Sequence, residues 1–310
     1  DTELKSLGVR IMKRTTAFGL YDNCVLGLIE RVTDHMPSGF NELPRQIFWT
    51  IRAKHVIIGS GALERHIAFN NNDVPGSMTV NASKHYLNRY GVLTGKEIVI
   101  ATNNDSVYPT AETLSNAGAK VIILEAREKI EFELSKSNYE VKFGTVPYSI
   151  NGLRKIESLD IANSSNHSIK KEETIPCDQV LMSGGWSPIV HLLSHRSVRP
   201  IWDSENLCFL PGDTKENISM IGSARGIWNK EDCIKSGQAG ALEAANRLGI
   251  TKTNYFFPKN GGWKNAIEPL YEVKLNKSRS KSFVDFQHDV TCDDVRLANR
   301  EGFISVEHLK

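Results

Sequence analysis

The segment from Lys96 to Arg127 constrains the fold more strongly than any other part of this sequence. It begins with an apolar run at 97–101, continues through a helical stretch that ends at Gly118, and returns to an apolar run at 121–124. Strand, helix and strand at these distances predict a βαβ unit in an α/β fold. Dinucleotide-binding domains open with this layout, and an acid closes their second strand, as Glu125 does here.

The turn after the first strand lacks the glycines with which such a unit holds a pyrophosphate. At the three positions of a GxGxxG turn the chain has Thr102, Asn104 and Val107. Asn and Asp tolerate left-handed backbone and cap helices, so we interpret 103–105 as a structural turn. Glu125 is then expected to be a solvated acid at a strand end. A nucleotide is therefore expected elsewhere in the protein.

Three other apolar strands each end in small residues, and we call each of these strand ends a glycine exit. These are His55–Ile58 before Gly59-Ser60-Gly61, Gln179–Met182 before Ser183-Gly184-Gly185, and Asn217–Ile221 before Gly222-Ser223. Small residues at the carboxyl end of a strand let the backbone approach a nucleotide at a topological switch point. We predict that Gly59, Ser60, Gly61 and Gly222 contact a cofactor, while tight turns that need positive φ would produce the same pattern.

Five further residues near these exits are candidate cofactor contacts. FAD enzymes with paired domains usually carry aspartate at the position of Ser223, and a serine hydroxyl suits NAD better, unless it caps the following segment. Arg65 and Arg225 each follow a glycine exit and could contact phosphate or be surface charge. Thr15 and Thr16 could line the pocket as hydroxyl donors or be ordinary residues of a polar turn.

Composition and charge exclude several other classes. A formal net charge of +2 and no basic run interleaved with aromatic residues argue against nucleic-acid binding. No apolar stretch approaches a membrane span, and the sequence does not begin with a signal peptide, so we expect a cytoplasmic protein. Five cysteines without CxxC spacing favour reduced thiols. His191 and His195 share a helix face without a third ligand, so we predict no metal site, and we predict no catalytic residue.

The order of the motifs predicts two Rossmann-like dinucleotide-binding lobes, as in a paired-domain flavoprotein. Residues 1–94 and 200–250 form the first, discontinuous lobe, and residues 95–199 form the second, degenerate one. In the first lobe we predict strands at 9–12, 25–32 and 45–53, of which the last two alternate enough to be antiparallel, and a polar turn at 14–19. We also predict helices at 82–90 and 230–248, the second with Gly237 and Gly240 for close packing on a sheet.

Residues 251–310 are predicted to be a linker and the start of a small helical C-terminal module. Thr291 is a plausible N-cap of its helix, with Asp294 completing a weakened capping box. Phe303, Val306 and Leu309 have helical spacing, and no cap follows them. We therefore expect a piece of a longer polypeptide.

Seven segments together resemble one family, the α subunit of heterotetrameric sarcosine oxidase. They are RTTAFGLYDN (14–23), GSGALER (59–65), NNDVPG (71–76), YLNRYGV (86–92), TNNDSVYPTA (102–111), LMSGGWSP (181–188) and FVDFQHDVTCDDVRLANREGF (283–303). The resemblance spans essentially the whole chain, and the last segment is the most specific to the family.

The resemblance implies a role within a complex of α, β, γ and δ subunits. In that family the α subunit binds NAD near its start and carries a folate-binding domain at its end, and this chain resembles only the middle. Sarcosine is oxidised at an FAD in the β subunit, electrons pass to an FMN at the α/β interface, oxygen yields peroxide, and tetrahydrofolate takes the one-carbon unit. This chain is then a scaffold and cofactor cradle, and alone it should bind NAD negligibly.

Two alternatives stay open at this point. Subunits of other flavin-dependent amino-acid dehydrogenases, of opine or proline type, share the RTTAFG segment and the glycine exits. They typically carry a cysteine cluster in the tail for an iron–sulfur centre, and this tail has only Cys292. The other alternative is an inert structural fragment, because the glycine-rich turn is missing.

Overall fold

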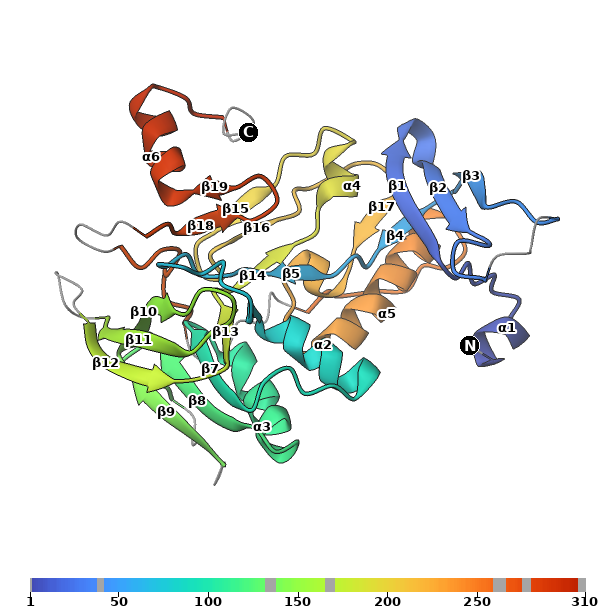
Figure 1. Cartoon of the computed structure of the whole chain (residues 1–310). Helices are drawn as coiled ribbons and strands as arrows, with labels where there is room; N and C mark the ends of the chain where they lie inside the picture. The colour runs from blue at the N-terminus through green and yellow to red at the C-terminus, as the bar shows by residue number, and fades with distance from the viewer. Residues whose placement is uncertain are drawn as a thin grey trace. The chain divides into compact units, whose positions relative to one another are not determined.

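A computed structural model describes residues 2–37, 42–131, 138–164, 171–258, 266–274 and 280–305. The chain is an α/β protein that divides into two compact units (Figure 1). Unit 1 consists of Asp1–Ala62, Pro188–Asp203 and Phe209–Gly261, and unit 2 consists of Leu63–Ser187, Ser204–Cys208 and Gly262–Lys310.

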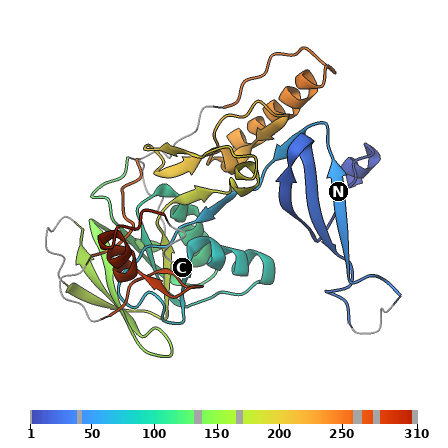
Figure 2. The ribbon, with the colours of Figure 1, turned by 90° about the horizontal axis from the view of Figure 1, so that it is seen from above.

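Unit 1 contains a three-stranded antiparallel sheet in the order β1-β2-β3, drawn in blue (Figure 2). Its strands are β1 (Thr15–Tyr21), β2 (Val25–Arg31) and β3 (Gln46–Arg52); the helix α1 (Thr2–Ser6) precedes β1, and the 3-10 turn η1 (Asp22–Cys24) joins β1 to β2. The antiparallel pair predicted at 25–32 and 45–53 is confirmed.

Two predictions for the start of the chain are wrong. Residues 9–12 form no strand, and most of the predicted turn at 14–19 belongs to strand β1. Threonine and aromatic residues favour strands, so the composition of β1 agrees with its structure. The register of β1 on β2 shifts between Ala17 and Gly19, and this irregularity interrupts the alternation by which a strand is recognised.

The second element of unit 1 is a parallel strand pair covered by a helix. It is built from β4 (Val56–Ile58), β17 (Ile218–Met220), the turn η3 (Gly222–Arg225), α5 (Lys230–Arg247) and the short helix α4 (His191–Ser194). Leu20 of β1 packs in one core with residues of β4 and β17. Glycine in α5 permits close packing as predicted, since a Cβ on Gly240 would lie 2.6 Å from Cγ2 of Ile221.

Unit 2 is organised around a five-stranded sheet in the order β6-β13-β7-β8-β9, with every neighbouring pair parallel. Its elements are β6 (Ser77–Thr79), α2 (Val80–Tyr90), β7 (Glu97–Thr102), the turn η2 (Asp105–Val107), α3 (Tyr108–Asn116), β8 (Lys120–Glu125), β9 (Tyr139–Phe143) and β13 (Gln179–Ser183). The predicted βαβ unit is therefore confirmed as β7-α3-β8.

The two faces of this sheet are covered differently. Ile98, Ile100 and Val121 point toward α2 and α3, whereas Val99 and Ala101 point into a second core. That second core includes residues of an antiparallel sheet made of β10 (Thr145–Asn151), β11 (Ser158–Asn163) and β12 (Lys171–Pro176). Because both faces are buried, the strands are continuous apolar runs without polar alternation.

The end of the chain packs on unit 2. Its described elements are β18 (Phe283–Asp285), β19 (Val290–Thr291) and α6 (Cys292–Arg300), and the predicted capping box of Thr291 and Asp294 is confirmed. Asn72 fixes this tail, because its side chain exchanges two hydrogen bonds of 2.9 Å with the backbone of Phe283. The stripe predicted at Val306 and Leu309 lies outside the described residues.

The division of the structure differs from the expected lobes at several boundaries. Residues 188–199, expected in the second lobe, belong to unit 1, and residues 204–208, expected in the first lobe, belong to unit 2. Residues 63–94 belong to unit 2, since β6 pairs with β13 and α2 packs against α3. Residues 262–310 also cluster with unit 2. The remaining strands, β5 (Ala62–Glu64), β14 (Trp186–Pro188), β15 (Ile201–Asp203) and β16 (Cys208–Leu210), lie near the points where the chain passes between units.

Candidate functional site

Two of the predicted glycine exits meet at one edge of unit 1. Strands β4 and β17 are parallel and in register, with Ile58 opposite Met220, so both chains leave the pair at the same end. The position that a Cβ on Gly61 would occupy lies 4.0 Å from Oγ of Ser223. Exits predicted from segments about 160 residues apart are therefore neighbours. They lie at the carboxyl ends of parallel strands, where α/β folds place their ligands.

Backbone hydrogen bonds hold both exits in place. The Ser60 hydroxyl donates to the carbonyl oxygen of Ile189 at 2.6 Å, and the Ile189 amide donates to the carbonyl oxygen of Gly61 at 3.0 Å. The Gly222 amide donates to Oγ of Ser236 at 3.1 Å. Gly61 and Gly222 have φ of +84° and +62°, a backbone region that favours glycine.

Arg225 ends the turn η3 that begins with Gly222. Its guanidinium carbon lies 4.1 Å from the centre of the Phe257 ring, a cation–π contact. Arg225 also lines a cavity of about 310 Å³ together with Glu243, Arg247 and Tyr255. Among the residues that the structure describes, Arg225 has no carboxylate partner, so its charge remains available to a ligand.

The structure does not bring the predicted threonines to these exits. Thr15 donates its hydroxyl to the carbonyl oxygen of Lys13 at 3.0 Å, and Thr16 follows it on β1. The residue of β1 that packs with β4 and β17 is Leu20. Five residues of strand separate Thr15 from Leu20, which corresponds to about 16 Å.

Arg65 belongs to unit 2 and is engaged there by the protein itself. Its guanidinium donates to the carbonyl oxygens of Leu207 at 2.5 Å and Gly184 at 3.3 Å. A Cβ on Gly185 would lie 2.3 Å from Nη2 of Arg65. The small residues of this third exit therefore accommodate an arginine side chain.

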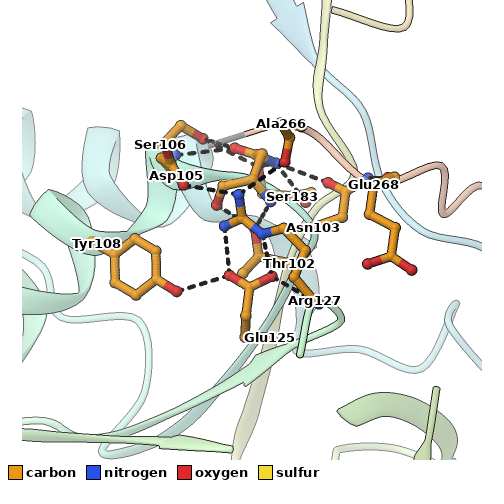
Figure 3. Close-up of polar contacts among 11 residues, drawn as sticks. Thr102, Asn103, Asp105, Ser106, Tyr108, Glu125, Arg127, Ser183, Ala266 and Glu268 are labelled. Carbon is orange, nitrogen blue, oxygen red and sulfur yellow. Dashed lines mark hydrogen bonds and ion pairs between the residues drawn. The ribbon is translucent and has the colours of Figure 1, made fainter. Parts of the chain in front are cut away.

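The corresponding edge of unit 2 is filled by a polar cluster (Figure 3). Arg127 lies between Glu125, with two contacts of 2.8 Å, and Asp105, at 2.9 Å. The Tyr108 hydroxyl donates to Glu125 at 2.8 Å. Glu125 is 0% exposed, so the prediction of a solvated acid is wrong. Arg127, two residues downstream, and Tyr108, at the start of α3, enclose the carboxylate.

The turn after β7 is structural, as interpreted, but without left-handed backbone. Asn104 has a φ of −152°, and its side chain accepts from the Ser106 amide at 3.0 Å. The same side chain donates to the carbonyl oxygen of Ser183 at 3.0 Å and so ties the turn to β13. Side-chain hydrogen bonds therefore replace the glycines.

A distant part of the chain lies against this cluster (Figure 3). Asn103 donates to the carbonyl oxygen of Glu268 at 2.6 Å, and the Glu268 amide donates to the Asn103 carbonyl oxygen at 3.2 Å. Arg127 donates to the carbonyl oxygen of Ala266 at 3.2 Å. No local pattern signals this contact, because 165 positions separate Asn103 from Glu268.

The protonation of the cluster follows from its burial and charges. Burial and then the charge of Glu125 raise the pKa of Tyr108. Burial disfavours charge on Arg127, yet its bonds to Glu125 and the charges of Glu125 and Asp105 raise its pKa. Burial, followed by the charge of Glu125, raises the pKa of Glu268. Tyr108 therefore stays neutral and Arg127 charged, as a fixed structural network.

Neither metal binding nor membrane insertion is supported by the described parts of the chain. These parts contain no group of three or more His, Cys, Asp or Glu side chains placed to hold a metal ion. Their helices are all too short or too polar to span a bilayer.

The fold is shared with a solved dehydrogenase. The L-proline dehydrogenase of P. horikoshii superposes with a TM-score of 0.62 at 14% identity, covering 96% of this chain and 54% of that one. At that identity the similarity establishes the fold alone. The chain is thus an α/β protein with the fold of that dehydrogenase.

Three of the sequence relatives are alpha subunits of sarcosine oxidase. The alpha subunit of sarcosine oxidase from Rhizobium meliloti strain 1021 is 34% identical over 99% of this chain, which is 31% of the relative. Two Corynebacterium counterparts are 31% and 32% identical, and the model of the sarcosine oxidase A3 domain matches residues 279–310. The chain is therefore a homologue of the sarcosine oxidase alpha subunit, and it spans about a third of the length of those relatives.

Proposed function

We propose that this chain is part of the α subunit of a sarcosine oxidase complex and holds NAD at the exits of unit 1. The reaction is the oxidative demethylation of sarcosine to glycine with tetrahydrofolate and oxygen, giving methylenetetrahydrofolate and hydrogen peroxide. The observation that carries the proposal is the meeting of Gly61 and Gly222–Ser223 at one parallel-strand edge, in a homologue of the α subunit.

The residues at this edge fit a dinucleotide. Gly61 and Gly222 leave room for a pyrophosphate beside the backbone, while the hydroxyl of Ser223 and the cation of Arg225 offer hydrogen bonds and charge. Gly59 stays a prediction, because its Cβ position lies 3.4 Å from Cγ1 of Ile221. NAD, when bound, acts here without hydride transfer, as a fixed part of the protein. Arg65, Ser60, Thr15 and Thr16 stay predictions as contacts, and Arg65 is the weakest because backbone carbonyls already hold it.

The proposed assembly places the redox chemistry on other subunits. The β subunit would carry FAD, an FMN would lie at the α/β interface, and the γ and δ subunits would complete the complex in the cytoplasm. The chain's own residues would then support and orient the cofactors without transferring protons or electrons. Tetrahydrofolate would be bound by a domain outside the present sequence.

The proposal is tested on the intact protein by calorimetry with NAD and by sarcosine-dependent oxygen uptake. Gly61→Leu is expected to weaken NAD binding at least about tenfold, because its side chain enters the space near Ser223. Gly118→Leu is the matched control, since Gly118 also has positive φ (+99°) and no atom within 4 Å of its Cβ position. Equal NAD binding by both variants would contradict the placement, and absence of sarcosine oxidation would contradict the activity.

The main alternative is a subunit of an opine-oxidising enzyme. An opine oxidase subunit of Rhizobium meliloti is 22% identical over 76% of this chain. Within the described tail, Cys292 is the single thiol, and burial followed by the charge of Glu272 raises its pKa to about 12. A thiolate ligand is therefore disfavoured there, which argues against an iron–sulfur centre. Oxygen or dye reduction with octopine in place of sarcosine would favour this alternative.

A further inference from the structure

A second polar cavity, of about 610 Å³, lies in unit 1 at the opposite end of the same strand pair. Three segments line it, namely residues 22–24 of the β1–β2 turn, residues 52–54 before β4, and residues 215–217 before β17, together with Arg196. The site thus lies at the amino ends of β4 and β17, whereas the glycine exits lie at their carboxyl ends.

Hydrogen bonds fix these three segments to one another. The Ala53 amide donates to the carbonyl oxygen of Cys24 at 3.0 Å. The Asn217 side chain donates to the carbonyl oxygen of Lys54 at 3.1 Å, and the Cys24 thiol donates to the carbonyl oxygen of Asn217 at 3.5 Å. The turn itself is tight, since Asn23 and Cys24 have φ of +58° and +54°. The walls of the cavity are therefore built before any ligand arrives.

The charges around the cavity are unbalanced toward the positive. Both carboxylates that line it, Asp22 and Glu216, are paired with the single guanidinium of Arg196 at 2.5 and 2.8 Å. Arg52, Lys54 and Lys215 also line it and make no ion pair with any described residue. Four cations against two carboxylates leave a net charge of +2 around one hollow.

We propose that this cavity binds a small anion of the phosphate class that carries at least two negative charges. Ammonium and guanidinium groups form their strongest hydrogen bonds with such oxyanions. A phosphate is far smaller than the cavity, so it would sit among the three free cations with water filling the remainder. The site shares no lining residue with Gly59–Gly61 or Gly222, and five residues of extended chain between Lys54 and Gly59 correspond to about 16 Å.

The experiment is isothermal titration of the intact protein with inorganic phosphate, and separately with pyrophosphate, in low-salt chloride buffer. Wild-type protein is expected to bind at least one of them with a millimolar or tighter dissociation constant. The double variant Lys54→Ala with Lys215→Ala is expected to lose at least about tenfold in affinity. Lys252→Ala, an exposed lysine of the same unit outside the cavity, should bind like wild type.

Circular dichroism and a thermal melt of the double variant establish that it is folded, and its NAD titration shows whether the other edge is intact. Unchanged phosphate affinity in the folded double variant would overturn the proposal, as would absence of binding by wild type up to about 10 mM of either anion. If the double variant misfolds, the charge-reversal variant Arg52→Glu on the exposed end of β3 replaces it, with the same expected loss of affinity. NAD binding that fails while phosphate binding persists would refute only the proposed function.

Discussion

In unit 1 the carboxyl ends of β4 and β17 carry Gly61 and Gly222, whereas in unit 2 the ends of β7 and β8 carry Asn104 and Glu125. Both are parallel-strand edges, where α/β folds place their ligands. At the first edge the side chains are absent or small, and Arg225 follows Gly222 in the same short turn. At the second edge every polar group named above has a protein partner.

The difference shows that the carboxyl ends of parallel strands can either leave space for a ligand or be filled by the protein's own side chains. Glycine leaves volume in which a phosphate can approach the backbone. The Asn104 side chain accepts the hydrogen bond of the Ser106 amide within the turn. Arg127 donates to Glu125, the acid that binds a ribose in dinucleotide-binding domains. Four tests, ordered by expected effect, examine this contrast.

Replacing Arg127 by alanine is the strongest test of the closed edge. Glu125 and Asp105 would be left as buried carboxylates without their cation, so we expect a loss of roughly 3–5 kcal/mol in the free energy of unfolding. Urea denaturation measures this loss. The control is Lys120→Ala, which changes an exposed residue at the start of β8. A loss below about 1 kcal/mol would mean that the network does not hold the edge closed. The double variant Glu125→Gln with Arg127→Met should recover part of the loss.

Glu64 gives unit 2 a predictable dependence on pH. Burial raises its pKa to about 7, although the Asn81 amide donates to it at 2.6 Å. The folded state therefore binds the proton of Glu64 more tightly than the unfolded state does. The resulting contribution to the free energy of unfolding is complete below about pH 4.5 and is lost as pH rises to about 7. It amounts to about 3 kcal/mol over that range.

The measurement for Glu64 is the free energy of unfolding at several pH values for wild type, Glu64→Gln and Glu112→Gln. Glu64→Gln should flatten the decline between pH 4.5 and 7, because the amide cannot ionise. Glu112→Gln is the matched control, because it removes one exposed carboxylate from the same unit. If Glu64→Gln retains the wild-type slope, the half-buried Glu64 carboxyl does not titrate in this range.

Adding one methyl group tests the open edge in unit 1. Gly240→Ala would place a Cβ 2.6 Å from Cγ2 of Ile221, the residue just before the Gly222 exit, and should destabilise the protein by about 1–3 kcal/mol. Gly237→Ala is the matched control on the same helix, because its nearest atom is 4.0 Å away. There the better helix propensity of alanine should stabilise by up to about 1 kcal/mol. Similar effects of both variants would show that α5 does not fix the exit.

The smallest expected effect concerns the contact between the turn and residues 266–268. Asn103→Ala removes the 2.6 Å bond to the Glu268 carbonyl oxygen, which is worth about 1 kcal/mol. Hydrogen exchange at the Glu268 amide, which donates to Asn103, should accelerate about fivefold. Exposed Asn88→Ala, on α2, should leave that amide unchanged. If the Glu268 amide exchanges as slowly in Asn103→Ala as in wild type, the bond from Arg127 to Ala266 is sufficient to hold residues 266–268.

Local sequence was sufficient where the chain folds against its own near neighbours. The runs around β7 and β8, the end of α3 near Gly118 and the capping box at Thr291 were predicted, because each depends on residues a few positions apart. Strand β1 was missed because its register irregularity disturbs the alternation, and a strand is defined by its partner as much as by its own residues.

For the candidate site, the sequence by itself determined which residues are small enough to let a nucleotide approach, Gly59, Gly61 and Gly222 among them. Only the tertiary structure decided that the exits at Gly61 and Gly222 lie at the same edge of unit 1. It also decided that the exit at Gly185 makes room for the Arg65 side chain. It also decided that Glu125 is buried with Arg127. The physical reason is that burial and charge pairing depend on contacts between distant segments, which residue type and spacing do not specify.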